Sequence, residues 1–100
     1  MHKLIIYDIE DDKTRNMVSK LFEKVGMVRV QKSVFVGWGS LVYWSKVNEL
    51  LKSKIEKLLK GNDTICVLNV DEVALKSCIL FGNADLFSTF ELLKKEYLIV

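Results

Sequence analysis

Residues 3–9, KLIIYDI, begin the fold with a run in which almost every position is apolar, β-branched or aromatic. Such a run is typical of a central strand that is covered on both faces. Alternation along the strand places Leu4, Ile6 and Asp8 on one face. A carboxylate at the end of so apolar a strand is costly unless it is solvated, protonated, paired or bound to a metal. Asp8 therefore either terminates the strand or carries chemistry.

The acidic cluster at residues 10–12 (EDD) predicts the start of a helix, because it supplies an N-cap and favourable first-turn charge. Apolar residues then recur at helical spacing, at Met17, Val18, Leu21, Phe22 and Val25. Gly26 is a natural helix stop. We expect one amphipathic helix of about a dozen residues between the acidic cluster and this glycine.

Residues 27–37, MVRVQKSVFVG, predict two short strands that meet near Lys32. Alternation gives each strand one valine face, formed by Val28, Val30, Val34 and Val36. We expect these valine faces to pack beneath the helices. The opposite face carries Arg29, Gln31, Ser33 and Phe35. On that face we interpret Phe35 as an interface residue, with a core position as the alternative.

The rest of the chain completes an α+β order. A leucine stripe over residues 47–59 predicts a second helix that Gly61 stops, residues 64–70 (TICVLNV) predict a strand, and residues 77–81 predict a short strand. The order βαββαβ is that of a ferredoxin-like sandwich, with an antiparallel sheet and both helices on one face. We divide the chain into a ferredoxin-like domain at residues 1–82 and a C-terminal tail at residues 83–100.

Composition favours a domain that shares its core with a second copy. The chain has 100 residues, half of them apolar, and a mean hydropathy of +0.19. A domain of this size buries only about 60–65% of its unfolded-chain surface, so an apolar surplus suggests that a partner covers the open sheet face. The net charge of +2 is uneven, because residues 13–60 hold eleven Lys and Arg against three acids. This basic segment predicts either a surface for a polyanion or ordinary lysine-rich helix faces.

Several function classes are excluded by what the sequence lacks. Cys66 and Cys78 form no CxxC pair and His2 is the sole histidine, which argues against a zinc site and against histidine-based nucleophilic catalysis. Two thiols in apolar runs fit a reducing, cytoplasmic compartment. No apolar run approaches 18 residues, so no membrane association is expected. His2, at the terminus, is given no role.

Three groups of residues could carry chemistry. Asp8 suits Mg²⁺, which takes one or two protein carboxylates and keeps several waters, and a two-fold axis would bring two copies together. Arg15 and Arg29, the only arginines, can grip phosphate with two donors, although an Asp–Arg ion pair is an equal alternative. Aromatic residues near the basic segment either stack on unpaired bases or belong to the core, namely Phe35, Trp38, Tyr43 and Trp44.

Two stretches taken together resemble the CRISPR-associated protein two family, the small homodimeric partner of the integrase in CRISPR spacer acquisition. They are Tyr7-Asp8-Ile9 followed by Asp11-Asp12-Lys13 and Arg15, and Gly26 followed by RVQKSVFVG at residues 29–37. The resemblance implies a dimer formed through the sheets, with a tail strand that extends the partner's sheet. It also implies an endonuclease dependent on Mg²⁺, or alternatively Mn²⁺, that acts on single-stranded RNA or double-stranded DNA.

By motif match, the resemblance makes Asp8 the catalytic, metal-binding aspartate. It assigns further catalytic roles to Arg15, Arg29, Ser33 and Phe35, and nucleic-acid binding to Lys13, Arg15, Arg29 and Lys32. The chain departs from the family pattern at Met17, where some relatives have a second arginine, and at Val36, where an acidic residue is frequent. These departures bear on nuclease activity more than on the fold.

Our leading hypothesis is a homodimeric CRISPR adaptation protein that binds duplex DNA in complex with the integrase, CRISPR-associated protein one. The enzyme hypothesis is a metal-dependent phosphodiesterase centred on Asp8, with an arginine holding phosphate. The alternatives are a ferredoxin-like toxin-type ribonuclease and a non-catalytic dimeric adaptor.

Overall fold

Four strands form one antiparallel sheet in the computed structural model, which describes residues 1–79, 81 and 82. In spatial order they are β2 (Val28–Gln31), β3 (Val34–Trp38), β1 (His2–Asp8) and β4 (Thr64–Val70). The central strand β1 pairs with β3 on one side and with β4 on the other. This topology confirms the predicted α+β, ferredoxin-like arrangement. The predicted tail at residues 83–100 lies outside the described residues.

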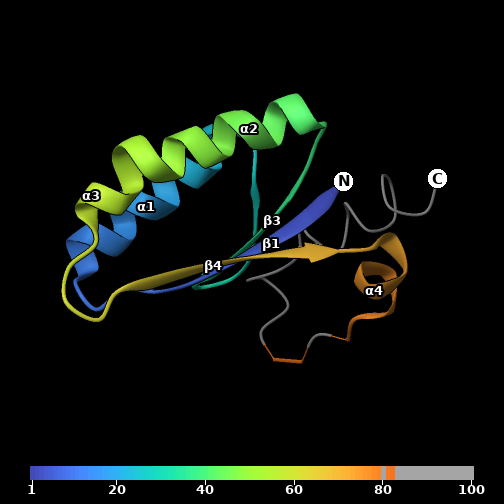
Figure 1. The fold of residues 1–100 in the computed structure, drawn as a ribbon. Helices are drawn as coiled ribbons and strands as arrows, with labels where there is room; N and C mark the ends of the chain where they lie inside the picture. The colour runs from blue at the N-terminus through green and yellow to red at the C-terminus, as the bar shows by residue number, and fades with distance from the viewer. Residues whose placement is uncertain (80, 83–100) are drawn as a thin grey trace.

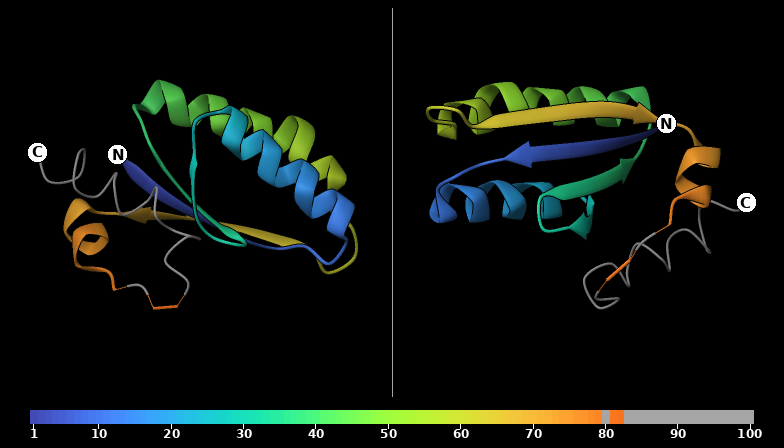
Figure 2. Two further views of the ribbon diagram at one scale, coloured as in Figure 1. Left: turned by 180° about the vertical axis from the view of Figure 1, so that it is seen from behind. Right: turned by 90° about the horizontal axis from the view of Figure 1, so that it is seen from below.

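Two long helices cover one face of the sheet (Figures 1 and 2). The first is α1 (Asp12–Lys24); the second runs without a break through α2 (Leu41–Leu50), a π-helical segment η1 (Leu51–Ile55) and α3 (Glu56–Leu58). The Asp11 carboxylate caps α1 by accepting hydrogen bonds from the backbone N–H and the hydroxyl of Thr14, at 2.8 and 2.7 Å. Gly26 follows the helix at a φ of +87°. The acidic cluster and the glycine stop thus act as predicted.

The main core lies between the sheet and these two helices. The side chains that have no exposed surface are Ile5, Val18, Phe22, Phe35 and Ile55. The rings of Phe22 and Phe35 are tilted against each other with centroids 5.4 Å apart. Phe35 is paired with Ile5 across β1 and β3, so both side chains point toward the helices. The interpretation of Phe35 as an interface residue is therefore wrong within this chain.

The valine faces of β2 and β3 point away from the two long helices. Val30 and Val36 form a second, smaller core with Leu75 of α4 (Glu72–Ser77). The prediction that the valines pack beneath the long helices is wrong. The face that meets these helices is the one that carries Phe35, and the valine face lies on the other side of the sheet. The physical reason is size: the ring of Phe35 fills the wide space between helices and sheet, while the valines suit the shallow cover that a six-residue helix provides.

The strand predicted at residues 77–81 is not seen in the described residues, and the short helix α4 ends where that strand was expected to begin. Ser77 is the last residue of α4, and the described residues 78, 79 and 81 are not in a strand. The Asp71 carboxylate caps α4 by accepting from the N–H of Ala74 at 2.7 Å. The capped helix buries Leu75 against Val30 and Val36.

Candidate functional site

Asp8 is the last residue of β1 and is exposed. It lies opposite Thr64 in β4, on the sheet face that points away from the long helices. Its carboxylate makes no ion pair with any residue in the part of the chain that the structure describes. Within one chain the Asp8 carboxylate is therefore solvated at the end of the strand, which is one of the explanations that the sequence left open.

The sheet face around Asp8 is apolar and half open. Ile6 is 40% exposed although it lies in the central strand β1, and Leu68 on the edge strand β4 is 44% exposed. Together with the half-buried Leu4 and with Cys66, which pairs with Ile6, they form what we call the outer sheet patch. The expectation that β1 is covered on both faces holds on the helix side; on the outer face Leu4 packs against the smaller core, while Ile6 stays open in the described chain.

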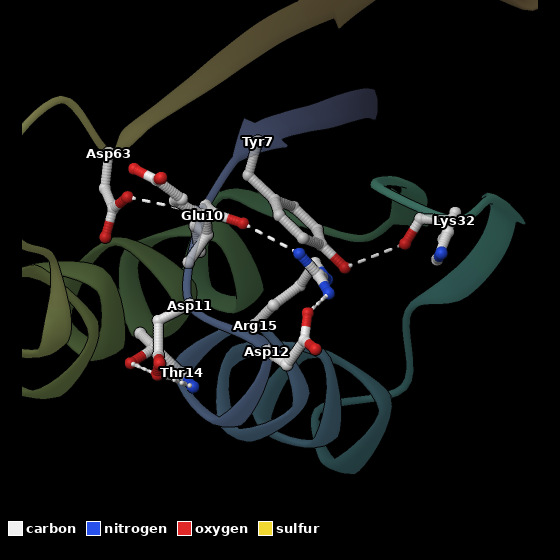
Figure 3. A network of polar contacts seen from close by, with 9 residues as sticks. Tyr7, Glu10, Asp11, Asp12, Thr14, Arg15, Lys32 and Asp63 are labelled. Atoms are coloured by element: carbon white, nitrogen blue, oxygen red, sulfur yellow. Dashed lines mark hydrogen bonds and ion pairs between the residues drawn. The ribbon is translucent and has the colours of Figure 1, made fainter.

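Tyr7 holds the turn between β2 and β3 against the end of β1. Its hydroxyl donates to the carbonyl of Lys32 at 3.2 Å (Figure 3), and its backbone N–H donates to the carbonyl of Ser33 at 3.1 Å. Burial raises the pKa of the Tyr7 phenol, against the opposing effect of the charges on Arg29 and Arg15, which keeps the phenol a hydrogen-bond donor. Sequence reasoning did not predict Tyr7 as a site residue; the available signal was its place beside Asp8 in a buried strand.

Arg15 is engaged within its own chain. Its guanidinium donates to the carbonyl of Ile9 at 3.0 Å and forms an ion pair with Asp12, one turn earlier on α1 (Figure 3). The sequence left open an Asp–Arg ion pair, and the structure forms one. The partner is Asp12 and not the neighbouring Asp8. Arg15 thus fixes the junction between β1 and α1.

Arg29 is engaged as well. Its guanidinium lies 5.2 Å from the centre of the Phe35 ring and 3.7 Å from the carboxylate of Glu23 on α1. These contacts place Arg29 and Phe35 on the helix side of the sheet. Asp8 lies on the other side, and Phe35 is fully buried. One chain therefore brings Ser33 and Lys32 close to the strand that ends at Asp8, but does not gather Arg15, Arg29 and Phe35 around its carboxylate.

The predicted metal site is incomplete in one chain. No group of three or more His, Cys, Asp or Glu side chains that could hold a metal ion occurs among residues 1–79, 81 and 82. Asp8 supplies a single exposed carboxylate, which fits Mg²⁺ only if water or a second copy of the chain supplies the other oxygen ligands.

His2 has a more defined place than the sequence indicated. It is the first residue of β1, and its ring lies 6.2 Å from that of Trp38, which is 67% exposed. Trp44, by contrast, is buried and donates from its indole nitrogen to the carbonyl of Met1 at 3.1 Å. Of the aromatic residues considered for base stacking, only Trp38 is exposed, since Tyr43 is half-buried.

Comparison with known proteins points to one family. The sequence profile described as CRISPR associated protein Cas2 matches residues 1–77. A protein of Pyrobaculum aerophilum named CRISPR-associated endoribonuclease Cas2 2 is 33% identical over 87 residues, covering 82% of this chain and 87% of the relative. A CRISPR-associated endoribonuclease Cas2 1 of Francisella tularensis subsp. novicida is 42% identical over 82 residues, covering 82% and 80%. One of Methanospirillum hungatei is 38% identical, covering 79% and 80%.

None of the helices in the described ranges is both long and apolar enough to cross a membrane.

Proposed function

Because the chain belongs to the Cas2 family of CRISPR-associated proteins, we propose that it is a cytoplasmic, homodimeric CRISPR adaptation protein that binds duplex DNA. In this proposal it joins the integrase, CRISPR-associated protein one, in the spacer integration complex. It also has Mg²⁺-dependent endonuclease activity at Asp8, on single-stranded RNA or double-stranded DNA. The relatives named above carry the word endoribonuclease in their names, which supports the enzymatic part. The observation that carries the proposal is the placement of Asp8 at the rim of an open, apolar sheet face.

The outer sheet patch supports the dimer. Exposed Ile6 in the central strand β1 and exposed Leu68 in the adjacent edge strand β4 leave apolar surface in water, at a cost of about 25 cal/mol per Å². A two-fold axis through such a patch buries the same residues from both copies. Since Asp8 lies on the same face as Ile6, two-fold pairing through this patch would also bring two Asp8 carboxylates toward each other.

Two Asp8 carboxylates would satisfy the Mg²⁺ preference for one or two protein oxygens with several waters. A bound Mg²⁺ supplies an activated water and stabilises the charge that develops on the phosphate. The chain's own residues keep the strand end in place: Tyr7 fixes the turn that carries Ser33, and Arg15 fixes the carbonyl of Ile9. In this proposal Arg15 and Arg29 are positioning residues, because their guanidinium groups are already engaged by Asp12 and Glu23.

That engagement of both arginines favours one alternative function, a non-catalytic DNA-binding adaptor. The adaptor would need the dimer and the basic surface but not the Asp8 pair. The toxin-type ribonuclease draws no support from the comparisons, since the matching profile and the relatives named above are of the Cas2 family.

A cleavage assay on the purified full-length chain separates these functions. Labelled single-stranded RNA and duplex DNA are incubated with wild type, Asp8→Asn and a matched control, Glu49→Gln, whose exposed carboxylate lies on α2. We expect Mg²⁺-dependent cleavage by wild type and Glu49→Gln, its loss in EDTA, and at least a hundredfold lower rate for Asp8→Asn, roughly the scale of losing a charged catalytic group. Wild-type cleavage by Asp8→Asn would remove the nuclease and leave the adaptor.

A further inference from the structure

Unlike the two arginines, the lysines of the two long helices form no ion pair with any described residue. These helix-layer lysines are Lys13, Lys20, Lys24, Lys46, Lys52, Lys54 and Lys57. All seven are exposed, and none forms an ion pair or a cation–π contact with any residue in the described ranges. Their ammonium groups are therefore available to a ligand, whereas a phosphate at Arg15 or Arg29 would have to displace Asp12 or Glu23.

On α1 the lysines form a single row. Lys13, Lys20 and Lys24 recur at spacings of seven and four residues, which places them on one stripe of a helix with 3.6 residues per turn. The buried residues Val18 and Phe22 occupy a different stripe, toward the sheet. At 1.5 Å per residue, the row from Lys13 to Lys24 is about 16 Å long.

The second helix also carries exposed lysines, and it lies on the same face of the sheet as α1 (Figure 1). In the π-helical segment η1, Leu51 and Ile55 lie four residues apart and both pack into the core. Within that segment Lys52 and Lys54 are both exposed. Helix insertions of this kind are frequent at functional sites, and here the insertion displays two cations within one turn.

We propose that the helix layer, rather than the Asp8 end of the sheet, is the surface that binds the backbone of duplex nucleic acid. The proposal rests on the DNA binding proposed above and names its site. A duplex carries one phosphate per about 1.7 Å of axis, so about nine phosphates pass along a row of 16 Å. Unpaired lysines facing such a density of negative charge release counterions and bind without sequence preference.

The ligand of the helix layer is a duplex and not a single strand, because the two long helices present no exposed aromatic ring on which bases could stack. Binding sites for single strands combine positive charge with exposed aromatic rings on which bases stack. On the two long helices Trp44 is buried, and the half-buried Tyr43 donates its hydroxyl to the carbonyl of Val25 at 2.7 Å. The exposed Trp38 belongs to β3. Backbone contact without base contact is the mode that this surface supports.

The test is the salt dependence of binding by the full-length chain, measured by fluorescence anisotropy with a labelled duplex of mixed sequence. For the helix-layer variant Lys20→Gln/Lys54→Gln, the slope of log K against log[salt] should fall in magnitude by about 1.8, at about 0.9 per lost phosphate contact. The charge-matched variant Lys3→Gln/Lys76→Gln, outside the helix layer, should change it by less than half a unit. Thermal melting of each variant checks the fold.

Three results would overturn the proposal. If Lys32→Gln or the charge-matched variant lowers the slope as much as the helix-layer variant does, the duplex binds elsewhere, and the proposed DNA-binding function stands without this site. If a single-stranded DNA of equal length binds more tightly than the duplex and loses affinity in the helix-layer variant, the helix layer binds single strands and not duplex. If wild type binds no duplex at any salt concentration, the proposed DNA binding fails as well.

Discussion

Replacing Phe35 with alanine should abolish activity by unfolding the protein and not by removing a catalytic group. Family resemblance makes Phe35 a candidate catalytic residue, yet its side chain has no exposed surface and lies in the core beneath the two long helices. It contacts the rings of Tyr7 and Phe22 at centroid distances of 6.2 and 5.4 Å. A substrate cannot reach this ring while the domain is folded.

The expected loss of stability on Phe35→Ala follows from this buried environment. A buried Phe→Ala change costs about 3–5 kcal/mol, from lost transfer free energy and the cavity that remains. A domain of this size has a total stability of about 5–15 kcal/mol, and each kcal/mol lowers Tm by about 4–8 °C. We therefore expect Phe35→Ala to lower Tm by at least about 12 °C. Phe35→Leu keeps an apolar side chain of comparable reach and should lose much less.

The assay combines circular-dichroism melting with nucleic-acid cleavage or binding, each measured at a temperature where the variant is folded. We expect the activity of Phe35→Leu, per folded molecule, to be within a few-fold of wild type. At low temperature, the residual folded fraction of Phe35→Ala should retain activity. A Phe35→Ala protein with wild-type Tm and no activity would refute the reasoning, because the ring would then act on substrate directly.

Two further predictions concern helix capping and the dimer. Hydrogen bonds from the hydroxyl and backbone N–H of Thr14 hold the pKa of the Asp11 carboxyl below its ordinary value. The ionised carboxylate therefore stabilises the folded protein above about pH 4, and this stabilisation is lost as the pH falls through the lowered pKa. The Tm difference between wild type and Asp11→Ala should accordingly be largest near neutral pH and shrink in acid; a difference that is constant down to pH 2 would contradict this. Leu68→Lys, in the outer sheet patch, should convert the proposed dimer to monomer in light scattering after gel filtration. Val73→Lys, on the exposed side of α4, should leave the dimer intact, and a dimeric Leu68→Lys protein would exclude the patch as the interface.

Local signals in the sequence predicted the elements well, because their causes are local. The acidic cluster before α1 places Asp11 where its carboxylate can accept from Thr14, and Gly26 can adopt the positive φ that ends the helix. The alternation of β3 separates Phe35 from Val34 and Val36. Alternation alone cannot say which of the two faces meets the helices, since that depends on packing between distant segments.

The same limit explains what was missed around the site. Arg29 of β2 and Phe35 of β3 share one face of the sheet and look unsuited to a core, but Arg29 stacks on the Phe35 ring and reaches Glu23 on α1. The resemblance placed five residues in one site, but only the packing shows that Asp8 and Phe35 lie on opposite faces of the sheet. In α4, the segment after β4, Leu75 packs against Val30 and Val36 of two distant strands. No local pattern in the sequence predicts such a contact.

The opposite placement of Asp8 and the helix-layer lysines has a consequence for any dimer that forms through the outer sheet patch. Such a dimer would bring the two Asp8 residues between the sheets and leave the two lysine layers outside. A helix packs on a sheet at about 10 Å and has a radius of about 5 Å, so roughly 15 Å would separate the duplex-binding surface from the sheet face that carries Asp8. A duplex held by the lysines cannot then be the strand cleaved at the same subunit's Asp8. Binding and cleavage should therefore be separable: Lys20→Gln/Lys54→Gln should still cleave short substrates, and Asp8→Asn should still bind duplex with the wild-type salt dependence.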